Sequence, residues 1–426
     1  MSEDPFAAAS ADELRVLLRE WIRRNAPRGL TTVIDWCVRV DLPGSVGSAI
    51  SETDYARAQQ DPLFRDWEQR CLQARLVCPS WPEQFGGRGW RAPEMTALDE
   101  EFFLAGVPRI DRVQGESMVG PSIMLHGTGE QQATLLPKII SGEHRYCQGF
   151  SEPDAGSDLA SARTRGVVEG EEVVITGQKV WTSRFAVANM IFVLCRTDPE
   201  QSKHRGLSYV ILPFTPGRNG IEARPIRQMT GGHEFGEVFF DGARARLSDV
   251  VGGLGNGWQV VQSTLGFERA AAGRATTMLV LSRERELAAL VELARSNGAA
   301  ADPLVRQRLA WAHTQVRLLR ATWERTVEEV ASGRDPGAQL STWKLFWSEY
   351  HLRLGSLALD IAGPGGLVRP GGGGYALDPW QDAFLVAHSG TIYAGTSEVQ
   401  RNIIGEGTLG LPREPKPREP KQAGFS

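Results

Sequence analysis

The chain has 426 residues, of which 41% are hydrophobic and 23% charged, and its formal net charge at pH 7 is −4. This length predicts about three domains with apolar cores of their own. The small, evenly mixed charge excludes the strong basic field that attracts nucleic acid or an anionic membrane.

The beginning of the chain and its hydropathy both argue against export and membrane insertion. The first residues are Met-Ser-Glu-Asp-Pro, which lack the basic start and apolar stretch of a secretion signal. No apolar run approaches the roughly 18 residues that span a bilayer. We therefore expect a soluble, cytoplasmic protein with no membrane or nucleic-acid partner.

The cysteines give no sign of a metal site or a disulfide framework. There are five, an odd number, and they are scattered along the chain at positions 37, 71, 78, 147 and 195. No two of them have the Cys-x-x-Cys spacing typical of zinc sites and dithiol redox pairs. We expect no bound metal, no structural disulfide and a reducing compartment.

Residues 1–145 have mostly helical periodicity. A helix is predicted from residue 11 to residue 24, with Ser10 as its N-cap. Its apolar residues recur at helical spacing: Leu14, Leu17, Leu18 and Trp21. The first domain is therefore predicted to be helical and to end near residue 145.

Short β-favouring runs replace this pattern between residues 146 and 250. The clearest are residues 172–176, 190–194, 208–212 and 237–240, and Gly, Pro, Asn and Asp separate them. Such spacing predicts a small antiparallel barrel or sandwich as the middle domain.

Helical periodicity returns after Gly257 and continues to about residue 361. Gly253, Gly255 and Gly257 precede it, but they do not form Gly-x-Gly-x-x-Gly and follow no βαβ unit, so a dinucleotide-binding fold is excluded. The third domain is predicted to cover residues 251–411. Residues 412–426 are charged and proline-rich, which predicts a disordered tail.

The most informative stretch is Gly-Phe-Ser-Glu-Pro-Asp-Ala-Gly-Ser-Asp at residues 149–158, followed by Trp181-Thr182-Ser183. A flavin accepts hydride at N5 and then carries negative charge near N1 and O2, so its site needs backbone N–H groups and short hydroxyls. These segments supply such groups and one large indole. Taken alone, residues 153–156 are also typical of a β-turn, and Trp181 of a core residue.

Together with Phe-Gly-Glu-Val-Phe-Phe-Asp at 235–241 and Ile-Tyr-Ala-Gly-Thr-Ser-Glu-Val-Gln-Arg-Asn at 392–402, these segments resemble the acyl-CoA dehydrogenases, in order along residues 10–411. The resemblance implies a mainly α-helical fold with an N-terminal helical domain, a middle β-barrel or sandwich and a C-terminal four-helix bundle. It also implies FAD as cofactor.

The matching motif positions give the implied site residues. Phe150 and Ser151 would contact the isoalloxazine, Trp181 would cover one ring face, Ser183 would lie near N5 and Ser157 near the pantetheine arm of CoA. Thr396 and Glu398 match positions that contact the ADP part of FAD, although Thr396 is also a good helix N-cap. The full cofactor-binding set is Gln148, Phe150, Ser151, Gly156, Ser157, Trp181, Ser183, Thr396 and Glu398.

The family's commonest catalytic base is missing, because Ala394 stands where many members have glutamate. Alanine keeps the backbone N–H that binds the thioester oxygen but cannot accept a proton. The resemblance implies Glu268 as the base, at the helix position used by isovaleryl- and long-chain-type members, with Arg269 beside the active site. Neither charge has a helical ion-pair partner three or four residues away. The alternative is an exposed Glu-Arg pair on a solvated helix face.

Two further segments depart from the family. The arginine and phenylalanine that grip the FAD pyrophosphate have no clear match, with residues 282–287 in their place, and residues 360–366 replace the usual Phe-Gly-Gly loop. Both changes, and Ala394, would suit a non-catalytic subunit of a mixed tetramer. The intact segments 149–158 and 181–183 favour an enzyme.

The leading hypothesis is therefore an FAD-dependent acyl-CoA dehydrogenase that forms an enoyl-CoA, delivers electrons to an electron-transfer flavoprotein and assembles as a homo- or heterotetramer. The resemblance is to the actinobacterial branch that handles bulky, branched or dicarboxylic thioesters. An oxygen-using oxidase or flavin monooxygenase, and a carrier-protein thioester as substrate, remain alternatives at this point.

Overall fold

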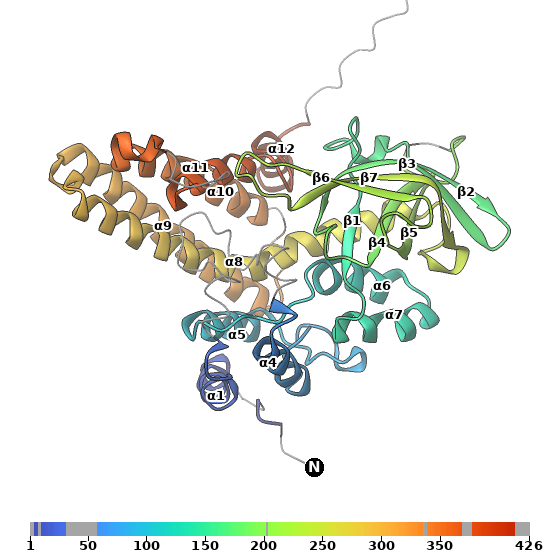
Figure 1. Ribbon diagram of the computed structural model, residues 1–426, viewed down its shortest axis with the longest axis horizontal. Coiled ribbons are helices and arrows are strands. Elements are labelled where there is room, and N and C mark those ends of the chain that lie inside the picture. The colour runs from blue at the N-terminus through green and yellow to red at the C-terminus, as the bar shows by residue number, and fades with distance from the viewer. Residues whose placement is uncertain are drawn as a thin grey trace, which may run out of the picture.

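The computed structural model describes residues 4–6, 10–30, 58–201, 203–334, 337, 339–368 and 377–413, and only the backbone of residues 268–276. In these ranges a group of helices precedes a mixed sheet, and a second group of helices follows it (Figure 1). The predicted order of helical, β and helical regions is confirmed. The exact domain boundaries stay predictions.

The first helical region begins with the helix that the periodicity predicts. Ser10 caps it by accepting a hydrogen bond from the Glu13 N–H at 3.2 Å, and Leu14 and Leu18 are buried on its inner face. The helices of this region are α1 (Ala11–Asn25), α4 (Pro62–Gln73), α5 (Ala92–Leu104), α6 (Gly120–His126) and α7 (Gly129–Ser141), with a 3-10 turn η1 (Glu83–Phe85) and a π-helical turn η2 (Gly115–Val119).

The middle region is one sheet with strand order β6-β7-β3-β2-β4-β5-β8, and β1 pairs with β4. Its strands are β1 (Tyr146–Gly149), β2 (Arg165–Glu169), β3 (Glu172–Ser183), β4 (Met190–Arg196), β5 (Leu207–Pro213), β6 (Ile221–Ile226), β7 (Phe235–Arg246) and β8 (Val250–Val251); short 3-10 turns are η3 (Leu159–Ser161) and η4 (Leu247–Asp249). The β1–β4 and β2–β4 pairs are parallel, so the sheet is mixed and not purely antiparallel as predicted. The prediction failed there because apolar runs show where strands lie but not their relative direction.

Strand β4 explains how the sheet joins the helices. Its first six residues are buried, as its uninterrupted apolar run predicts for a strand covered on both faces. Phe192 and Leu194 belong to the core shared with the N-terminal helices, whereas Ile191 and Val193 face a separate core inside the β-region. The sheet is therefore fixed to the first helical region through one face.

The C-terminal region begins with a helix of 40 residues, α8 (Gly257–Ser296), which extends from the sheet to the far helices (Figure 1). The others are α9 (Pro303–Ala331), α10 (Gln339–Ala362), α11 (Pro379–Gly390) and α12 (Ser397–Ile403), with short turns η5 (Ala299–Ala301), η6 (Gly363–Leu367) and η7 (Ile404–Thr408). Helices α8, α9, α10 and α11 contribute to one apolar core, which confirms the predicted four-helix bundle.

Among the described residues, no helix combines the length and apolarity needed to cross a bilayer. Cys71, Cys78, Cys147 and Cys195 are buried free thiols. Cys37 and residues 414–426 of the predicted tail lie outside the described residues.

Candidate active site

The segment at residues 149–158 leaves strand β1 and folds into a tight turn. Glu152 and Ala155 exchange backbone hydrogen bonds of 3.1 Å, so a β-turn forms in this segment, one residue earlier than the predicted 153–156. Gly156 and Ser157 follow on the exposed surface. The turn is compatible with a cofactor site, since it leaves the backbone accessible.

A buried ion pair joins the two motifs of the β-region. The Lys179 ammonium, which has no exposed surface, lies 2.8 Å from Glu152 Oε1 and donates to the Phe150 carbonyl at 2.9 Å. The Glu152 carboxylate also accepts from the backbone N–H groups of Arg163 and Thr164 at 2.7 and 2.8 Å. The backbone of residues 150–152 is thus attached to strand β3 from inside the fold.

The charge state of Glu152 follows from this environment. Burial opposes its ionisation, but the Lys179 charge and three hydrogen bonds outweigh burial and lower the pKa of the carboxyl. The carboxylate therefore stays ionised at neutral pH. The attachment of residues 150–152 to strand β3 also has a backbone hydrogen bond, which the Val180 N–H donates to the Ser151 carbonyl at 2.9 Å.

Trp181 lies on β3 in a conformation that differs from that of a core residue. Its backbone φ is +60°, and 58% of its surface is exposed. A bulge between Lys179 and Thr182 in the β3–β7 pairing turns the indole outward, where the Phe235 ring meets it edge-on at 5.9 Å. The core interpretation of Trp181 is therefore wrong. An exposed indole on strained backbone is the kind of feature that concentrates at ligand sites.

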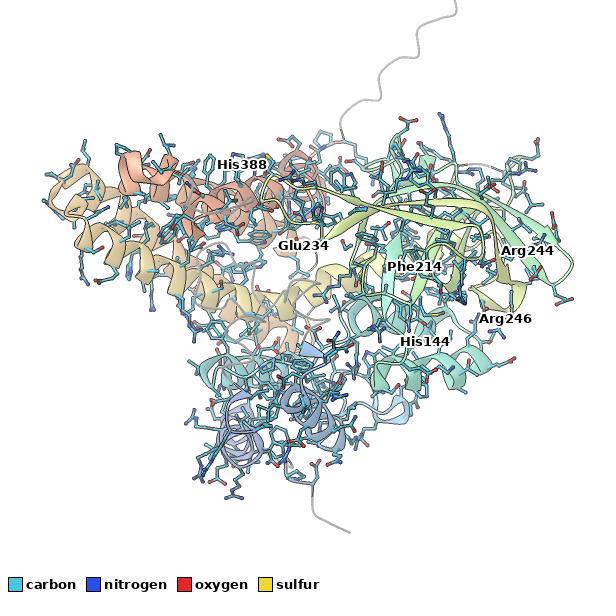
Figure 2. All side chains as sticks on the ribbon, in the orientation of Figure 1. His144, Phe214, Glu234, Arg244, Arg246 and His388 are labelled. Atoms are coloured by element: carbon cyan, nitrogen blue, oxygen red, sulfur yellow. The ribbon has the colours of Figure 1, made fainter. Side chains whose placement is uncertain are left out.

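The residues after Trp181 complete this end of the sheet. Thr182 is fully buried, and its hydroxyl has no hydrogen-bond partner among the described residues. Ser183 is half-buried and pairs with Phe235, and the Arg184 N–H donates to the Glu234 carbonyl. Figure 2 places Glu234 on the side of the sheet that faces the C-terminal helices, with Arg244 at the opposite end.

We predict that the flavin binds at the end of the sheet that carries Trp181 and Ser183, and this end therefore lies toward the C-terminal helices. Of the remaining β-region candidates, Phe150 has its ring buried against Phe192 and Tyr209 at 5.4 and 5.9 Å, so its side chain belongs to the core. Gln148 is half-buried on β1.

Ala394, Thr396 and Glu398 form a second group: Ala394 lies in the loop after α11, Thr396 is the N-cap of α12 and Glu398 lies in its first turn. Ala394 is exposed with φ at +52°, and Gly395 follows with φ at +87°. Thr396 caps α12 by accepting from the Val399 N–H at 3.3 Å, so the N-cap interpretation is confirmed. Hydrogen bonds from its own N–H and from the Thr396 hydroxyl lower the pKa of the exposed Glu398.

The structure does not bring all predicted residues into one contact network. Among the described residues, no hydrogen bond or ion pair joins Ala394, Thr396 or Glu398 to the β-region group. Glu268 and Arg269 lie in the backbone of α8, 11 residues or more past its start at Gly257, and their side chains lie outside the described set. Their roles therefore stay predictions.

The departures at residues 282–287 have a structural explanation. Glu284 forms two 2.6 Å hydrogen bonds with Arg320 of α9, and the Arg285 guanidinium lies 3.8 Å from the centre of the Phe103 ring. The Glu286 carboxylate pairs with Arg283 and with His351 of α10. Glu284, Arg285 and Glu286 thus contact neighbouring helices of the same chain and serve the packing of the bundle. Arg283 pairs only within α8, and its buried Nε and Nη2 have no hydrogen-bond partner among the described residues.

Sequence reasoning missed Glu152 and Lys179 as members of the site. A signal existed for Lys179: it shares the inward face of β3 with Val173 and Ile175, and a lysine in such a position needs an acidic partner. Lys344 and Gln400, which contact the 394–395 loop, gave no comparable signal because their partners are backbone carbonyls.

Comparison with known proteins gives the family. Three family profiles match: "Acyl-CoA dehydrogenase, N-terminal domain" over residues 48–143, "middle domain" over 147–243 and "C-terminal domain" over 255–409. The acyl-CoA dehydrogenase IpdE1 of Mycobacterium tuberculosis is 45% identical over 83% of this chain and 89% of its own length. The chain belongs to the acyl-CoA dehydrogenase family.

Other relatives extend this similarity over nearly the whole chain. IpdE1 of Mycolicibacterium smegmatis is 42% identical over 95% of this dehydrogenase and 98% of its own length. A solved structure described as the Tcur3481-Tcur3483 steroid ACAD is 30% identical with a TM-score of 0.76, covering 96% of this chain and 100% of that one. The ChsE4-ChsE5 complex from Mycobacterium tuberculosis is 27% identical with a TM-score of 0.71, over 95% and 98%.

The dehydrogenase is thus an FAD-dependent oxidoreductase that acts on acyl-CoA, as the sequence predicted. The geometry of the β-region fits the cofactor: the outward indole, the half-buried Ser151 and Ser183, and the buried Thr182 hydroxyl, which has no partner among the described residues, lie at one end of the sheet.

Proposed function

We propose that this dehydrogenase oxidises the Cα–Cβ bond of a bulky, ring-bearing acyl-CoA, with Glu268 as the base. The observation that carries the base assignment is Ala394, which leaves the usual position without a carboxylate while its exposed backbone retains an N–H. The substrate class is supported by the two-protein steroid ACAD, which is similar to this chain over almost its full length.

In the proposed reaction the bound FAD supplies the acceptor for a hydride equivalent from Cβ. Residues 150–151, held by Lys179, would bind the isoalloxazine through main-chain groups, and Trp181 would exclude water from one ring face. The Ala394 N–H would donate to the thioester oxygen, which acidifies the α-proton. Glu268 would take that proton, and Arg269 would support the carboxylate or the thioester arm.

We propose further that the working assembly contains a second, different chain. Two similar solved structures are described as pairs of proteins, and residues 282–286 use their charges within this chain. The partner would then help to hold the ADP half of FAD. An electron-transfer flavoprotein would accept the electrons, and the free thiols suit a cytoplasmic location.

Anaerobic flavin reduction by a panel of acyl-CoAs tests the base. We expect Glu268→Gln to retain flavin and to lose about 10²–10⁴-fold in reduction rate, the range for removal of a general base. Glu292→Gln, an exposed acid on the same helix, is the matched control and should leave the rate unchanged. Equal rates for native protein and Glu268→Gln would reject the base assignment.

The partner is tested by its effect on bound flavin. The chain purified alone should bind flavin weakly, and co-expression with its partner should raise the flavin content. Full flavin occupancy and full activity of the isolated homo-oligomer would reject the mixed assembly. A colourless chain that stays inactive with every partner would instead support a non-catalytic subunit.

A further inference from the structure

We propose that Lys344 and Gln400 are positioning residues that present the thioester-binding peptide at Ala394. The inference rests on the proposed role of the Ala394 N–H. It concerns two side chains from different helices that hold one short loop.

Both side chains donate to carbonyls of this loop. Gln400 of α12 donates from Nε2 to the Ala394 carbonyl at 2.8 Å, and its side chain is buried. Lys344 of α10 donates from Nζ to the Gly395 carbonyl at 2.6 Å. Two consecutive carbonyls are therefore turned inward, toward helices α10 and α12.

The loop needs such support because its backbone is strained. Ala394 and Gly395 both have positive φ, +52° and +87°, and an alanine in this region is disfavoured. A side chain at Gly395 would place its Cβ 2.6 Å from Gln400 Nε2, so glycine is required for this approach. Strained backbone persists only where its surroundings fix it.

The consequence concerns the N–H groups of the same loop. Within the described part of the chain, no group accepts a hydrogen bond from the N–H of Ala394 or of Gly395. Ala394 is exposed and Gly395 half-buried, so the loop lies at the surface. With both carbonyls held by Lys344 and Gln400, the loop presents donors, which is the polarity that a developing oxyanion requires.

The charge of Lys344 acts in the same direction. Its ammonium lies one hydrogen bond from the loop, and partial burial weakens the screening of this charge by water. Burial also lowers the pKa of Lys344, while Glu349 and Glu398 favour the charged form. The Glu349 carboxylate accepts from Ser397 and pairs with Arg401, so it does not neutralise the Lys344 ammonium by a direct ion pair. The positive charge of Lys344 therefore acts on the loop.

A spectroscopic test separates positioning from stability. A 3-thiaacyl-CoA has an acidic α-proton, and its enolate beside oxidised flavin gives a long-wavelength charge-transfer band. The pH dependence of that band reports the pKa of the bound analogue, which rises if the oxyanion donor is misplaced. The variants are Lys344→Met, Lys344→Arg and Gln400→Met, in the assembled, flavin-loaded protein.

We expect Lys344→Met and Gln400→Met to keep bound flavin, to raise the pKa of the bound analogue and to lower kcat by about 10-fold or more with a small change in KM, because the loss falls on the transition state. Lys344→Arg should restore most of the rate. Gln132→Met is the matched control, since Gln132 also donates to carbonyls at a helix end, those of Met124 and Gly127. It should change stability only.

The outcomes are distinct. If native protein is reduced by acyl-CoA and the two methionine variants lose thermal stability but keep the analogue pKa and kcat, the positioning role is wrong. If no acyl-CoA reduces native protein and no charge-transfer band forms, the proposed function itself fails.

Discussion

The candidate site has two halves, one in the β-region and one at the Ala394 loop, and different interactions hold each of them in place. In the β-region, the Lys179–Glu152 pair lies inside the fold and fixes residues 150–152 from behind. In the C-terminal region, Lys344 and Gln400 hold a strained, exposed loop through its carbonyls. The first half is fixed by an ion pair in the core, whereas the second is an exposed loop held by one buried and one half-buried side chain.

This difference suggests a division of tasks. A buried ion pair is costly to break, so the β-region keeps its geometry with or without a ligand. The Ala394 loop has few contacts and open N–H groups, so its geometry is more easily changed. Variants of the first half should therefore act on folding and flavin retention, and variants of the second on the chemical step.

Removal of Lys179 should have the largest effect. Lys179→Met leaves the buried Glu152 carboxylate without its cation, which typically costs about 3–5 kcal/mol of the free energy of unfolding. We expect a marked fall in thermal midpoint by calorimetry and loss of flavin on gel filtration. The exposed Lys138→Met is the control.

The double variant Lys179→Met with Glu152→Gln sharpens this prediction. It removes the unpaired charge, so it should be more stable than Lys179→Met alone. Nearly native stability of the single variant would mean that the β-region does not depend on the ion pair, and the contrast between the two halves would disappear.

The next largest effect should be a loss of unfolding free energy at acid pH. The pKa of Glu152 is lowered in the folded protein, so its ionisation stabilises the fold above the unfolded value of 4.5, and this contribution is lost as pH falls through the folded pKa. Glu152→Gln should cost up to about 3–5 kcal/mol at pH 7, because it leaves the buried Lys179 ammonium without its anion, and it should flatten the stability–pH curve below pH 4.5. Denaturant titrations at several pH values measure this, and identical acid limbs for both proteins would contradict it.

The fold was largely predictable from sequence, and the reason is visible in single elements. The Ser10 cap and the spacing of Leu14 and Leu18 are local signals, and they predicted α1 almost to the residue. Strands β1, β2, β6 and β8 were not among the four predicted runs: β1 has four residues and β8 only two, β2 has charged residues at both ends, and β6 has charged residues and a proline. The parallel β1–β4 pair depends on long-range packing, which no local pattern encodes.

The site was predictable as a set of motifs but not as a network. The position of Trp181 in its motif was recognised, yet its outward direction follows from a bulge that the alternation of β3 does not reveal. Glu152 and Lys179 lie 27 residues apart and meet only after β3 has paired. A side chain that donates to a backbone carbonyl, as Lys344 does, requires no particular residue type at that carbonyl, so the sequence does not reveal the contact.

Trp181 offers a smaller and more specific test of the β-half. Trp181→Ala should leave stability nearly unchanged, because the indole is exposed and its backbone strained, but it should weaken flavin binding by about 5-fold through loss of about 1 kcal/mol of aromatic contact. Fluorescence titration of apoprotein with FAD measures this. Val168→Ala, another exposed apolar side chain on the sheet, is the control. Unchanged flavin affinity would remove Trp181 from the cofactor site.

The smallest expected effect concerns Thr182, whose buried hydroxyl has no partner among the described residues. Thr182→Val keeps the shape and removes the hydroxyl, so the apoprotein should gain up to about 1 kcal/mol, since an unsatisfied buried polar group carries a desolvation cost. If FAD accepts or donates a hydrogen bond there, the same variant should bind FAD less tightly while its apoprotein is more stable. Paired melts with and without FAD separate these effects. A variant that loses stability without FAD and keeps its affinity would show that Thr182 belongs to the core of the sheet and not to the cofactor face.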